Sequence, residues 1–509
     1  MNRVLHDSIK IEALKLVRRH QQYASNVAES LLRKERRSGI SSTKVLLNPQ
    51  YWAAHPGFDP YKVRSQSAGV AHAIDKALKS GSYNPRPAVK YGVPKGDGSE
   101  RVVSVFQVAD NAISRLTFER LMVKNARHLS PNAYAYRNDL TIHDAILHIT
   151  SDFQKKPRLF VAEFDFAKFF DSISHEHLDR VLHDQRFFIT SRERIVIDAF
   201  LRAPALALPD YSIHTLETRE RGIPQGTSIS LFLANIAAFP LDRKLEKLGV
   251  GFARYADDTL IWADDYSSVC AAVNAIEEIG LEMGVELNLG KSAGISILCP
   301  ADLAAEMQFK PKVSFIGYSI SPFVISIRPE NLERIKKHLS YLIYSNLLQA
   351  PKQGHLLPNR LSGLVDKDYL VMLVQIRRFL YGELTESKLR KYLGRQTPLM
   401  RYHGVMSFYP IVTDENLLRE LDGWLLNSVM RALKLRRKLF AHAGFTSTLL
   451  PHNSQKTDLL KLKIVTAGGK KLDLRFPSIA RVGRLMRRAA RVYGANVIAN
   501  PQSKHYYAP

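Results

Sequence analysis

Hydrophobic and polar residues change their spacing several times along the chain, and each change marks an expected element. Residues 1–80 are mostly helical in pattern and basic, and the run LLRKERRSG ends on Gly39, a common helix stop. Residues 83–106 hold two short β-prone runs around the turn GDG, which predicts a hairpin. Helical spacing returns at 109–128 and 141–156. This first part is therefore expected to be helical, with one hairpin inserted.

The middle of the chain alternates strands with helices. LFVAEFDF (159–166) predicts a buried strand that leads into a helix near FFDSISHEHL. Residues 222–249 open with the turn GIPQGTS and continue as an apolar helix. A hairpin is expected at 252–264, a helix at 268–284 and a further strand at 313–321. This order predicts an α+β layer with helices on one face of an antiparallel sheet. From about 330 onward the pattern is mainly helical.

Composition indicates which class of partner the folded chain would bind. The 509 residues are enough for several domains of about 150 residues each. They are 45% hydrophobic, so ordinary cores can form. The 73 Lys and Arg exceed the 48 Asp and Glu by 25 charges. A net charge this large favours a polyanionic partner, most simply nucleic acid, over a merely basic protein.

Cysteine content and apolar runs exclude other classes. The two cysteines, Cys270 and Cys299, cannot form a Cys-rich tetrahedral zinc site, and no CxxC occurs. We expect both to be reduced, buried small residues. The N-terminal segment has no apolar core of a signal peptide, and no run of about 18 apolar residues indicates a membrane span. The expected location is the cytoplasm.

Two basic stretches stand out in the C-terminal part. RALKLRRKL (431–439) has five basic residues and no acidic one. RVGRLMRRAAR (481–491) spaces its arginines by three and four residues, which predicts one helical face. The arginines of this second stretch are Arg481, Arg484, Arg487, Arg488 and Arg491. Such a face either contacts phosphates or is simply solvated, and the lack of interleaved acids favours phosphate contact.

Two aspartate pairs raise the question of chemistry. Asp257 and Asp258 lie between two β-prone runs, where a hairpin should turn. They are either a solvated turn or a pair of metal ligands held at a hairpin tip. Asp264 and Asp265, in WADDYSS, form a second pair that has the pattern of an ordinary exposed loop. A doubled aspartate alone is therefore weak evidence, and the context must decide.

A third carboxylate makes the first pair more informative. Two-metal phosphoryl transfer needs several carboxylates that converge on ions about 3.5–4 Å apart. Asp165 follows an apolar strand and could join Asp257 and Asp258, and Phe170 follows five residues later as a bulky aromatic. In this context seven motifs resemble those of a reverse transcriptase, in the same order. They are VPKGDGSERVVSV (93–105), AYAYRNDLTIHDAI (133–146), DFAKFFDSI (165–173), GIPQGTSIS (222–230), YADD (255–258), LNLGKS (287–292) and FIGYSIS (315–321).

The resemblance implies a fold and a division of the chain. Reverse transcriptases are right-hand polymerases with fingers, palm and thumb, so the expected class is α+β with an antiparallel palm sheet and a mainly α-helical C-terminal region. The expected parts are a basic helical extension at 1–80, fingers and palm at 81–325, and a helical, basic, thumb-like nucleic-acid-binding region at 326–509.

The resemblance also implies the catalytic and metal-binding residues. Asp165, Asp257 and Asp258 would hold two Mg²⁺ ions, for which Mn²⁺ can substitute, and the backbone carbonyl of Phe166 would be an extra ligand. One ion would lower the pKa of the primer 3′-hydroxyl and the other would neutralise the leaving pyrophosphate. On this reading, the repulsion between the two adjacent aspartates is offset by divalent cations.

Further residues are implied for nucleotide binding. Phe170 would be the steric gate that leaves no room for a 2′-hydroxyl. Lys95 and Arg101 would clamp the triphosphate. Gln225, in a turn flanked by glycines that permit a close backbone approach, would contact the incoming nucleotide. Lys291 could protonate pyrophosphate, although a lysine after a strand is usually only solvated.

The subtype is less well marked. ELDGWLLNSVMRAL (420–433) loosely resembles the thumb of group II intron maturases, but two cysteines exclude their Cys-rich nuclease. Retron reverse transcriptases have an Asn-Ala-x-x-His segment, which is absent, and a Val-Thr-Gly motif, which VTAGG matches only in part. The remaining resemblance is to bacterial defence-associated and abortive-infection reverse transcriptases. It implies a non-coding RNA template, dNTPs, a cDNA product, and an oligomer or partner protein, with no membrane.

Other function classes stay open at this stage. A non-catalytic RNA-binding scaffold need not keep all three aspartates, and an RNA-directed RNA polymerase would have to admit the 2′-hydroxyl that Phe170 excludes. Template-independent or protein-templated DNA synthesis would use the same chemistry and is not excluded. Tyr506 and Tyr507 are candidates for protein priming, although a disordered tail is the more common role for such a segment.

Overall fold

The computed structural model of the chain describes most of its residues and divides them into two units. The described ranges are 2–41, 43–94, 98, 100–156, 158–211, 218–290, 292, 294–299, 307–382, 384–397, 402–465, 468–469 and 471–495. Within them, unit 1 combines Met1–Ala24 with Val45–Lys312, and unit 2 combines Ser25–Lys44 with Val313–His505. Each unit is described by itself below.

The N-terminal region is helical, as its pattern predicts. Helix α1 spans Asn2–Ser38 and ends at Gly39, whose φ of +70° is the left-handed conformation that favours glycine. In unit 1, α1 buries Leu5, Ile9 and Ala13 in the main core. Short helices follow at Gln50–Trp52 (η1), Pro56–Phe58 (η2), Pro60–Ser65 (α2) and Ser67–Lys79 (α3).

The predicted fingers hairpin is present and gains a third strand. Strands β1 (Ala88–Pro94) and β2 (Glu100–Val105) pair antiparallel from Val89↔Val105 to Pro94↔Glu100. The short strand β5 (Ala205–Leu206) pairs parallel with β1. The helices of this part of unit 1 are α4 (Val108–Asn125), α5 (Ile142–Phe153), α6 (Phe169–Ser172), α7 (His175–Asp184), α8 (Ser191–Arg202) and η3 (Leu208–Asp210).

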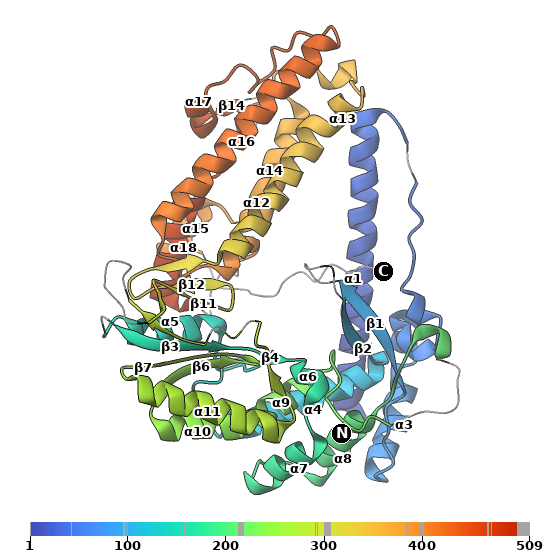
Figure 1. Ribbon diagram of the computed structural model, residues 1–509. Helices are drawn as coiled ribbons and strands as arrows, with labels where there is room; N and C mark the ends of the chain where they lie inside the picture. Colours follow the sequence, from blue (N-terminus) through green and yellow to red (C-terminus); the bar gives the residue numbers. More distant parts are fainter. Residues whose placement is uncertain are drawn as a thin grey trace. The chain divides into compact units, whose positions relative to one another are not determined.

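A five-stranded sheet forms the palm of unit 1 (Figure 1). Its strands, in spatial order, are β10 (Phe309–Lys310), β9 (Ile295–Leu298), β3 (Leu159–Phe164), β7 (Asp258–Ala263) and β6 (Gly251–Tyr255). All neighbours are antiparallel except β9 and β10. Helices α10 (Phe239–Leu248) and α11 (Tyr266–Met283) lie together on one face of this sheet (Figure 1). The remaining strands of unit 1, β4 (Phe166–Ala167) and β8 (Glu286–Leu287), pair antiparallel beside it.

The core explains why two sequence runs are so apolar. In the central strands, Val161, Ala162, Leu260 and Ile261 are fully buried, because the sheet is covered on both faces at these positions. Helix α9 (Ser228–Ala237) buries nearly all of its side chains, as an all-round apolar helix should. Ala162, Ile261 and most of α9 thus belong to the main core of unit 1.

Unit 2 is mainly helical and carries a small antiparallel sheet. The sheet consists of β11 (Val313–Phe315), β12 (Tyr318–Ile320) and β13 (Ile325–Ile327). Its helices are α12 (Pro329–Ile343), the π-helical segment η4 (Tyr344–Leu348), α13 (Gln349–Lys352), η5 (Pro358–Arg360), α14 (Lys367–Tyr381), α15 (Glu386–Leu393), η6 (Val405–Phe408), α16 (Glu415–His442), α17 (Lys456–Lys461) and α18 (Ile479–Tyr493). A hairpin of β14 (Lys463–Val465) and β15 (Lys471–Asp473) completes the unit.

Several expectations can now be compared with this fold. The α+β class with an antiparallel-rich palm sheet and a helical C-terminal region is confirmed. The predicted three-part division stays a prediction, since the two units cut the chain differently. Cys270 and Cys299 are free thiols; Cys299 is buried and Cys270 only half-buried. Among the described helices, none is long and apolar enough to cross a membrane.

Candidate active site

The sheet register brings the three predicted aspartates to one end of the palm. Strand β3 pairs with β7 up to Phe164↔Thr259. Asp165 directly follows Phe164, and Asp258 directly precedes Thr259, so both aspartates lie at the same end of this strand pair. Asp257 lies in the two-residue loop that joins β6 to β7. Residues distant in sequence, Asp165 and the Asp257–Asp258 pair, thus share one edge of the sheet.

The hairpin that carries Asp257 and Asp258 has an unusual turn. Tyr255 pairs with Asp258, so Ala256 and Asp257 alone form the loop. Ala256 has a φ of +60°, whereas Asp257 is not among the residues with positive φ. A positive φ at the first loop position is typical of a type II′ turn, where glycine is the usual residue. An alanine here holds the backbone in a strained conformation of the kind found at functional sites.

Asp165 is held by a neighbouring asparagine. The Asn288 backbone N–H donates to the Asp165 carbonyl at 2.8 Å, and Asn288 Nδ2 donates to Asp165 Oδ2 at 3.3 Å. Next to it, Phe166 pairs with Leu287 across β4 and β8. Because the Asp165 carbonyl takes the hydrogen bond of this ladder, the Phe166 carbonyl points away from β8. Asn288 was not singled out from the sequence, where it is only part of LNLGKS.

Phe170 is fixed between the palm and the glycine-rich turn. It lies half-buried on α6, with its ring edge-on to Phe169 at 5.9 Å between centroids. Its backbone carbonyl accepts a hydrogen bond from Ile223 N–H at 2.7 Å. Gly222 has a φ of +78°, and a Cβ there would lie 2.6 Å from the Asp171 carbonyl oxygen. This glycine therefore permits the turn to pack on the backbone of α6.

Gln225 connects the same turn to the fingers hairpin. Its Nε2 donates to Asp171 Oδ2 at 3.1 Å, and its carbonyl accepts the Ser104 N–H of β2 at 2.6 Å. Gly226, with a φ of +116°, would place a Cβ 2.8 Å from the Ser104 carbonyl oxygen. The glycines were expected to let a nucleotide approach the backbone. In the structure, the backbones of Asp171 and Ser104 already approach them closely.

The predicted triphosphate clamp is described only in part. Arg101 is exposed on β2, opposite Val93 of β1. Lys95 and Lys291 lie outside the described residues, as do Tyr506 and Tyr507. The structure thus places Arg101 on the fingers hairpin and leaves the roles of the two lysines as predictions.

Tyr136 is a site residue that sequence reasoning missed. Its φ of +62° is rare for a bulky side chain, and its ring centroid lies 6.2 Å from that of Tyr255. Burial, and then the negative charge of Asp257, raises the pKa of Tyr136 to about 12, and the charge of Arg101 opposes this rise. Tyr136 therefore lies within electrostatic reach of both Asp257 and Arg101. AYAYR carries no residue type that would have marked it.

The donor atoms at this end of the sheet suit a hard cation, although no preformed cage is present. Among the residues that the structure describes, no group of three or more His, Cys, Asp or Glu is arranged to hold a metal ion. Asp165, Asp257 and Asp258 offer only oxygen donors, which Mg²⁺ prefers. Mg²⁺ keeps several waters and completes its shell with substrate phosphates, so a few carboxylates suffice.

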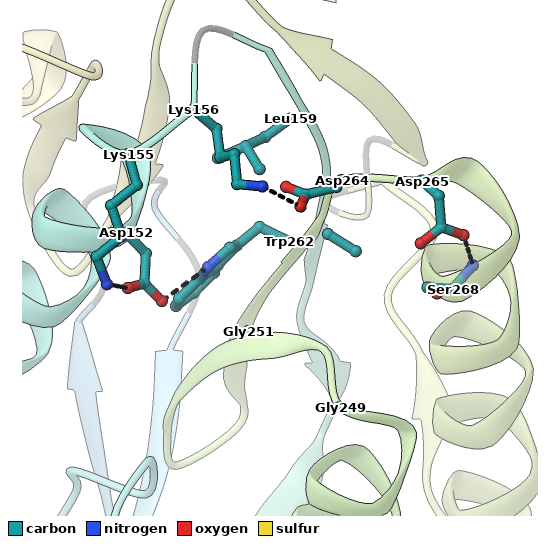
Figure 2. A pocket seen from close by; sticks show the side chains of 11 residues that line it. Asp152, Lys155, Lys156, Leu159, Gly249, Gly251, Trp262, Asp264, Asp265 and Ser268 are labelled. Atoms are coloured by element: carbon teal, nitrogen blue, oxygen red, sulfur yellow. Dashed lines mark hydrogen bonds and ion pairs between the residues drawn. The ribbon is translucent and has the colours of Figure 1, made fainter.

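A cavity in the palm lies away from the candidate active site. A hollow of about 270 Å³ is lined by residues around the far end of β7, among them Trp262, Asp264 and Lys156 (Figure 2). Its charges are paired, since Lys156 contacts Asp264 at 2.6 Å and Lys155 contacts Asp152 at 2.7 Å. We assign no chemistry to it, because both of its lysines are paired with aspartates and it lies at the opposite end of β7 from Asp258.

The predicted basic face is found on α18 in unit 2. Arg481, Arg484, Arg488 and Arg491 are exposed, whereas Arg487 is half-buried. Arg487 donates to Glu415 Oε1 and to the Val412 carbonyl, at 2.8 and 2.9 Å. In the described part of the chain, Arg488 and Arg491 have no ion-pair partner. The phosphate-contacting role predicted for this face would therefore rest mainly on Arg488 and Arg491, its outer arginines.

Comparisons with known proteins match the palm and fingers segment. Residues 93–320 match the family model of the reverse transcriptase (RNA-dependent DNA polymerase). Protein YkfC of Escherichia coli K12 is 25% identical over 202 residues, which are 38% of this chain and 50% of YkfC. An uncharacterized 91 kDa protein in the cob intron of Schizosaccharomyces pombe is 26% identical over 213 residues, 41% of this chain and 24% of that protein. The match thus spans half or less of each relative.

Solved structures with similar folds include telomerases. Telomerase from Candida albicans in complex with a fragment of telomeric RNA is 14% identical, with a TM-score of 0.39 over 75% of this chain and 68% of that one. Apo telomerase from Candida tropicalis is 12% identical, with a TM-score of 0.38 over 75% of this chain and 71% of that one. Scores this low add no detail to the site. The family match and the ordered motifs agree, and residues 93–320 are therefore a reverse transcriptase domain.

Proposed function

We propose that this protein is an RNA-directed DNA polymerase that extends a primer by nucleotidyl transfer at Asp165, Asp257 and Asp258. The observation that carries the proposal is the register of β3 and β7, in which Asp165 and Asp258 adjoin the last pair, Phe164↔Thr259, and Asp257 lies in the adjoining turn. These residues lie inside the segment that matches the reverse transcriptase model. The arrangement brings three carboxylates to one end of the β3–β7 strand pair.

These residues would hold two Mg²⁺ ions, with the Phe166 carbonyl as an extra ligand and Mn²⁺ as a substitute. The ions would supply Lewis acidity for the primer hydroxyl and for the leaving pyrophosphate. The chain's own contribution is to fix the carboxylates: Asn288 orients Asp165, and the hairpin turn orients Asp257 and Asp258.

Substrate selection would fall to residues around Phe170. A ring packed near the sugar excludes a 2′-hydroxyl, and the hydrogen bond between the Phe170 carbonyl and Ile223 N–H keeps that ring in place. Arg101 would bind the triphosphate together with Lys95, and Lys291 would donate a proton to pyrophosphate. Gln225 would contact the nucleotide from its anchored turn.

For the biological role, we propose a bacterial antiviral defence protein that copies a dedicated non-coding RNA in the cytoplasm, as an oligomer or with a partner protein. The mainly helical C-terminal region supports this choice. A second candidate is an intron-associated reverse transcriptase. It is favoured by one observation, the similarity to a protein in the cob intron of S. pombe. Template-independent or protein-templated synthesis on the same fold remains the third.

One purification tests both activity and role. The protein is purified from a native-like host, the RNA and DNA that accompany it are sequenced, and primer extension on an RNA template is measured with dNTPs. One enriched structured RNA with complementary DNA supports a dedicated templated enzyme of the defence type. Intron RNA selects the second candidate, and DNA without complementary RNA selects untemplated synthesis. Absence of both nucleic acid and extension refutes the polymerase proposal.

A further inference from the structure

A buried ion pair lies directly beneath the hairpin turn of the candidate active site. Arg254 on β6 and Asp242 on α10 are both 0% exposed. Arg254 Nε donates to Asp242 Oδ1 and Arg254 Nη2 donates to Asp242 Oδ2, each at 2.6 Å. The two planar groups therefore face each other in the bidentate geometry that suits guanidinium and carboxylate. Arg254 is also among the largest fully buried side chains.

The third donor of this arginine reaches the strained turn. Arg254 Nη1 donates to the backbone carbonyl of Ala256 at 3.1 Å. Ala256 is the loop residue with the φ of +60°, and Asp257 follows it directly. The guanidinium thus holds the peptide that joins Ala256 to Asp257, and that peptide sets where the two aspartates point.

The backbone of Arg254 is itself fixed on the side away from β7. Its N–H donates to the Asn132 carbonyl, and its own carbonyl accepts the Tyr134 N–H, both at 2.9 Å. Side chain and backbone together give Arg254 contacts to α10, to the segment 132–134 and to the turn. A residue tied to three elements can hold a strained loop in a single position, which its own two-residue sequence would not do.

A stability role alone does not explain the pair. Two charges lose their hydration when they are buried, and well-packed apolar residues of similar volume are often as stable or more so. A buried pair that also donates to a turn carbonyl gains something that apolar residues cannot provide, which is a fixed backbone geometry. The geometry therefore points to orientation of the turn as its purpose.

We propose that Arg254, supported by Asp242, is a positioning residue that fixes the hairpin turn so that Asp257 and Asp258 are preorganised to bind divalent cations. This inference rests on the proposed function of those aspartates. Arg254 touches neither substrate nor metal and acts through the Ala256 carbonyl. Loss of this contact is expected to loosen the turn while the sheet and its core persist.

The test removes the pair without leaving a buried charge. The double variant Arg254→Met/Asp242→Leu replaces it with apolar side chains, and Arg254→Lys keeps one charge but cannot span both partners. Asn125→Ala serves as a matched control, because Asn125 is a fully buried polar residue of unit 1 that bonds to Leu121 and Phe188. Folding of each variant is followed by circular dichroism and thermal unfolding.

Three readouts separate positioning from general stability. In metal-free protein, amide hydrogen exchange of the peptide covering 252–260 is expected to rise at least tenfold in the double variant and to stay unchanged in Asn125→Ala. Mn²⁺ binding, measured by the electron paramagnetic resonance of the free ion, is expected to weaken about tenfold. On primer extension, kcat is expected to fall about 100-fold, the scale of a small misplacement, while KM for dNTP stays within about twofold. For Arg254→Lys, all three values should lie between those of the wild type and those of the double variant.

The outcomes distinguish this inference from the proposed function. A folded double variant with wild-type exchange, Mn²⁺ affinity and kcat overturns the positioning role. If the double variant does not fold, Arg254→Lys decides by the same three measurements. Asp257→Asn is run in parallel: if it keeps full activity, the proposed metal site is wrong, whatever Arg254 does. If Asp257→Asn is inactive and the Arg254 variants are normal, only the present inference fails.

Discussion

The two units of this protein divide its charge very unequally. Within the ranges 1–24 and 45–312, unit 1 has 36 Lys and Arg against 34 Asp and Glu, a net charge of +2. Unit 2 has 37 against 14 in the ranges 25–44 and 313–505, a net charge of +23. Nearly all of the excess of 25 that indicates nucleic-acid binding therefore lies outside the unit that carries the candidate active site.

The difference indicates that catalysis and the electrostatic attraction of nucleic acid are assigned to different units. Unit 1 concentrates carboxylates where divalent cations would be needed, and residues 251–300 alone contain eight Asp and Glu against two Lys and Arg. Unit 2 presents arginines at long range to any polyanion. Changes in unit 1 should therefore abolish turnover and leave nucleic-acid affinity intact, and changes in unit 2 should do the reverse. Single variants in each unit test this division.

The largest effect is expected from Asp257→Asn. Loss of one carboxylate from a two-metal site removes several kcal/mol of charge stabilisation, so primer extension should fall by about 10³-fold or more. RNA affinity, measured by fluorescence anisotropy, should stay within about twofold. Asp264→Asn is the control, because Asp264 lies at the other end of β7 and pairs only with Lys156 among the described residues. Equal losses in both variants would refute the assignment of the site to the hairpin.

That control also shows what the sequence can and cannot reveal. Both aspartate pairs read alike in sequence, as doublets beside the same strand. The fold separates them: Asp258 lies at the same end of the β3–β7 pair as Asp165, whereas Asp265 accepts Ser268 N–H at 2.8 Å and caps α11. The hydrogen bond from Ser267, followed by that from Ser268, lowers the pKa of Asp265 to about 2. Motif order alone favoured Asp257 and Asp258, since local composition could not separate the two pairs, and the assignment of the site to this pair stays a prediction.

Phe170→Ala should change selectivity rather than turnover. Removing the ring opens space beside the sugar, and the discrimination between dNTP and rNTP is expected to fall by about 10–100-fold, the range that one hydrophobic contact provides. Single-nucleotide incorporation with matched dNTP and rNTP measures it. Phe169→Leu is the neighbouring control, since Phe169 is 2% exposed and packs in the core. Unchanged discrimination would place the gate at another residue.

In unit 2, the outer arginines of α18 should affect binding only. Arg488→Gln/Arg491→Gln removes two charges without ion-pair partners in the described part of the chain, so RNA affinity should fall about tenfold. Its logarithmic salt slope should fall by about 1.5–2, at ~0.7–0.9 per phosphate contact. Turnover at saturating template should not change. Arg487→Gln is the matched control, because its charge already pairs with Glu415, and there the salt slope should stay the same. Equal slopes for all variants would indicate a solvated face.

The basic runs show where prediction from sequence ends. Arg436 stands in the run 431–439, between the exposed residues Leu435 and Arg437, yet it is 2% exposed. It donates to Asp366 at 2.7 Å and to Asp368 at 2.8 Å, carboxylates about 70 positions earlier in the chain. The composition of the run marked Arg436 only as one of five basic residues, and only tertiary packing decides which of them is buried. The same reason kept Arg254 and its partner Asp242 from being recognised as part of the site.

The smallest expected effect is on stability. It concerns two buried aspartates, one in each unit, whose pKa values are shifted in opposite directions. In unit 1, burial raises the pKa of Asp110 to about 6, against the hydrogen bond from Tyr83. In unit 2, although burial opposes it, the hydrogen bond from His452 and the charge of Arg436 lower the pKa of Asp366 to about 2. Each shift makes stability depend on pH, in different windows.

The sign follows from which form the fold prefers. Asp110 favours folding in its protonated form, so its contribution is complete below pH ~4 and is lost as the pH rises through 6. Asp366 favours folding when ionised, so its contribution is complete above pH ~4 and is lost only as the pH falls towards 2. Between pH 4.5 and 7, Asp110→Asn should therefore flatten the decline of the unfolding temperature by a few degrees, about 5 °C. Calorimetry on both proteins measures it, with Tyr83→Phe as a variant that keeps the carboxyl. Because pH 4.5–7 lies above the titration of Asp366, Asp366 should contribute no such slope, and a decline that survives in Asp110→Asn would have to come from another group.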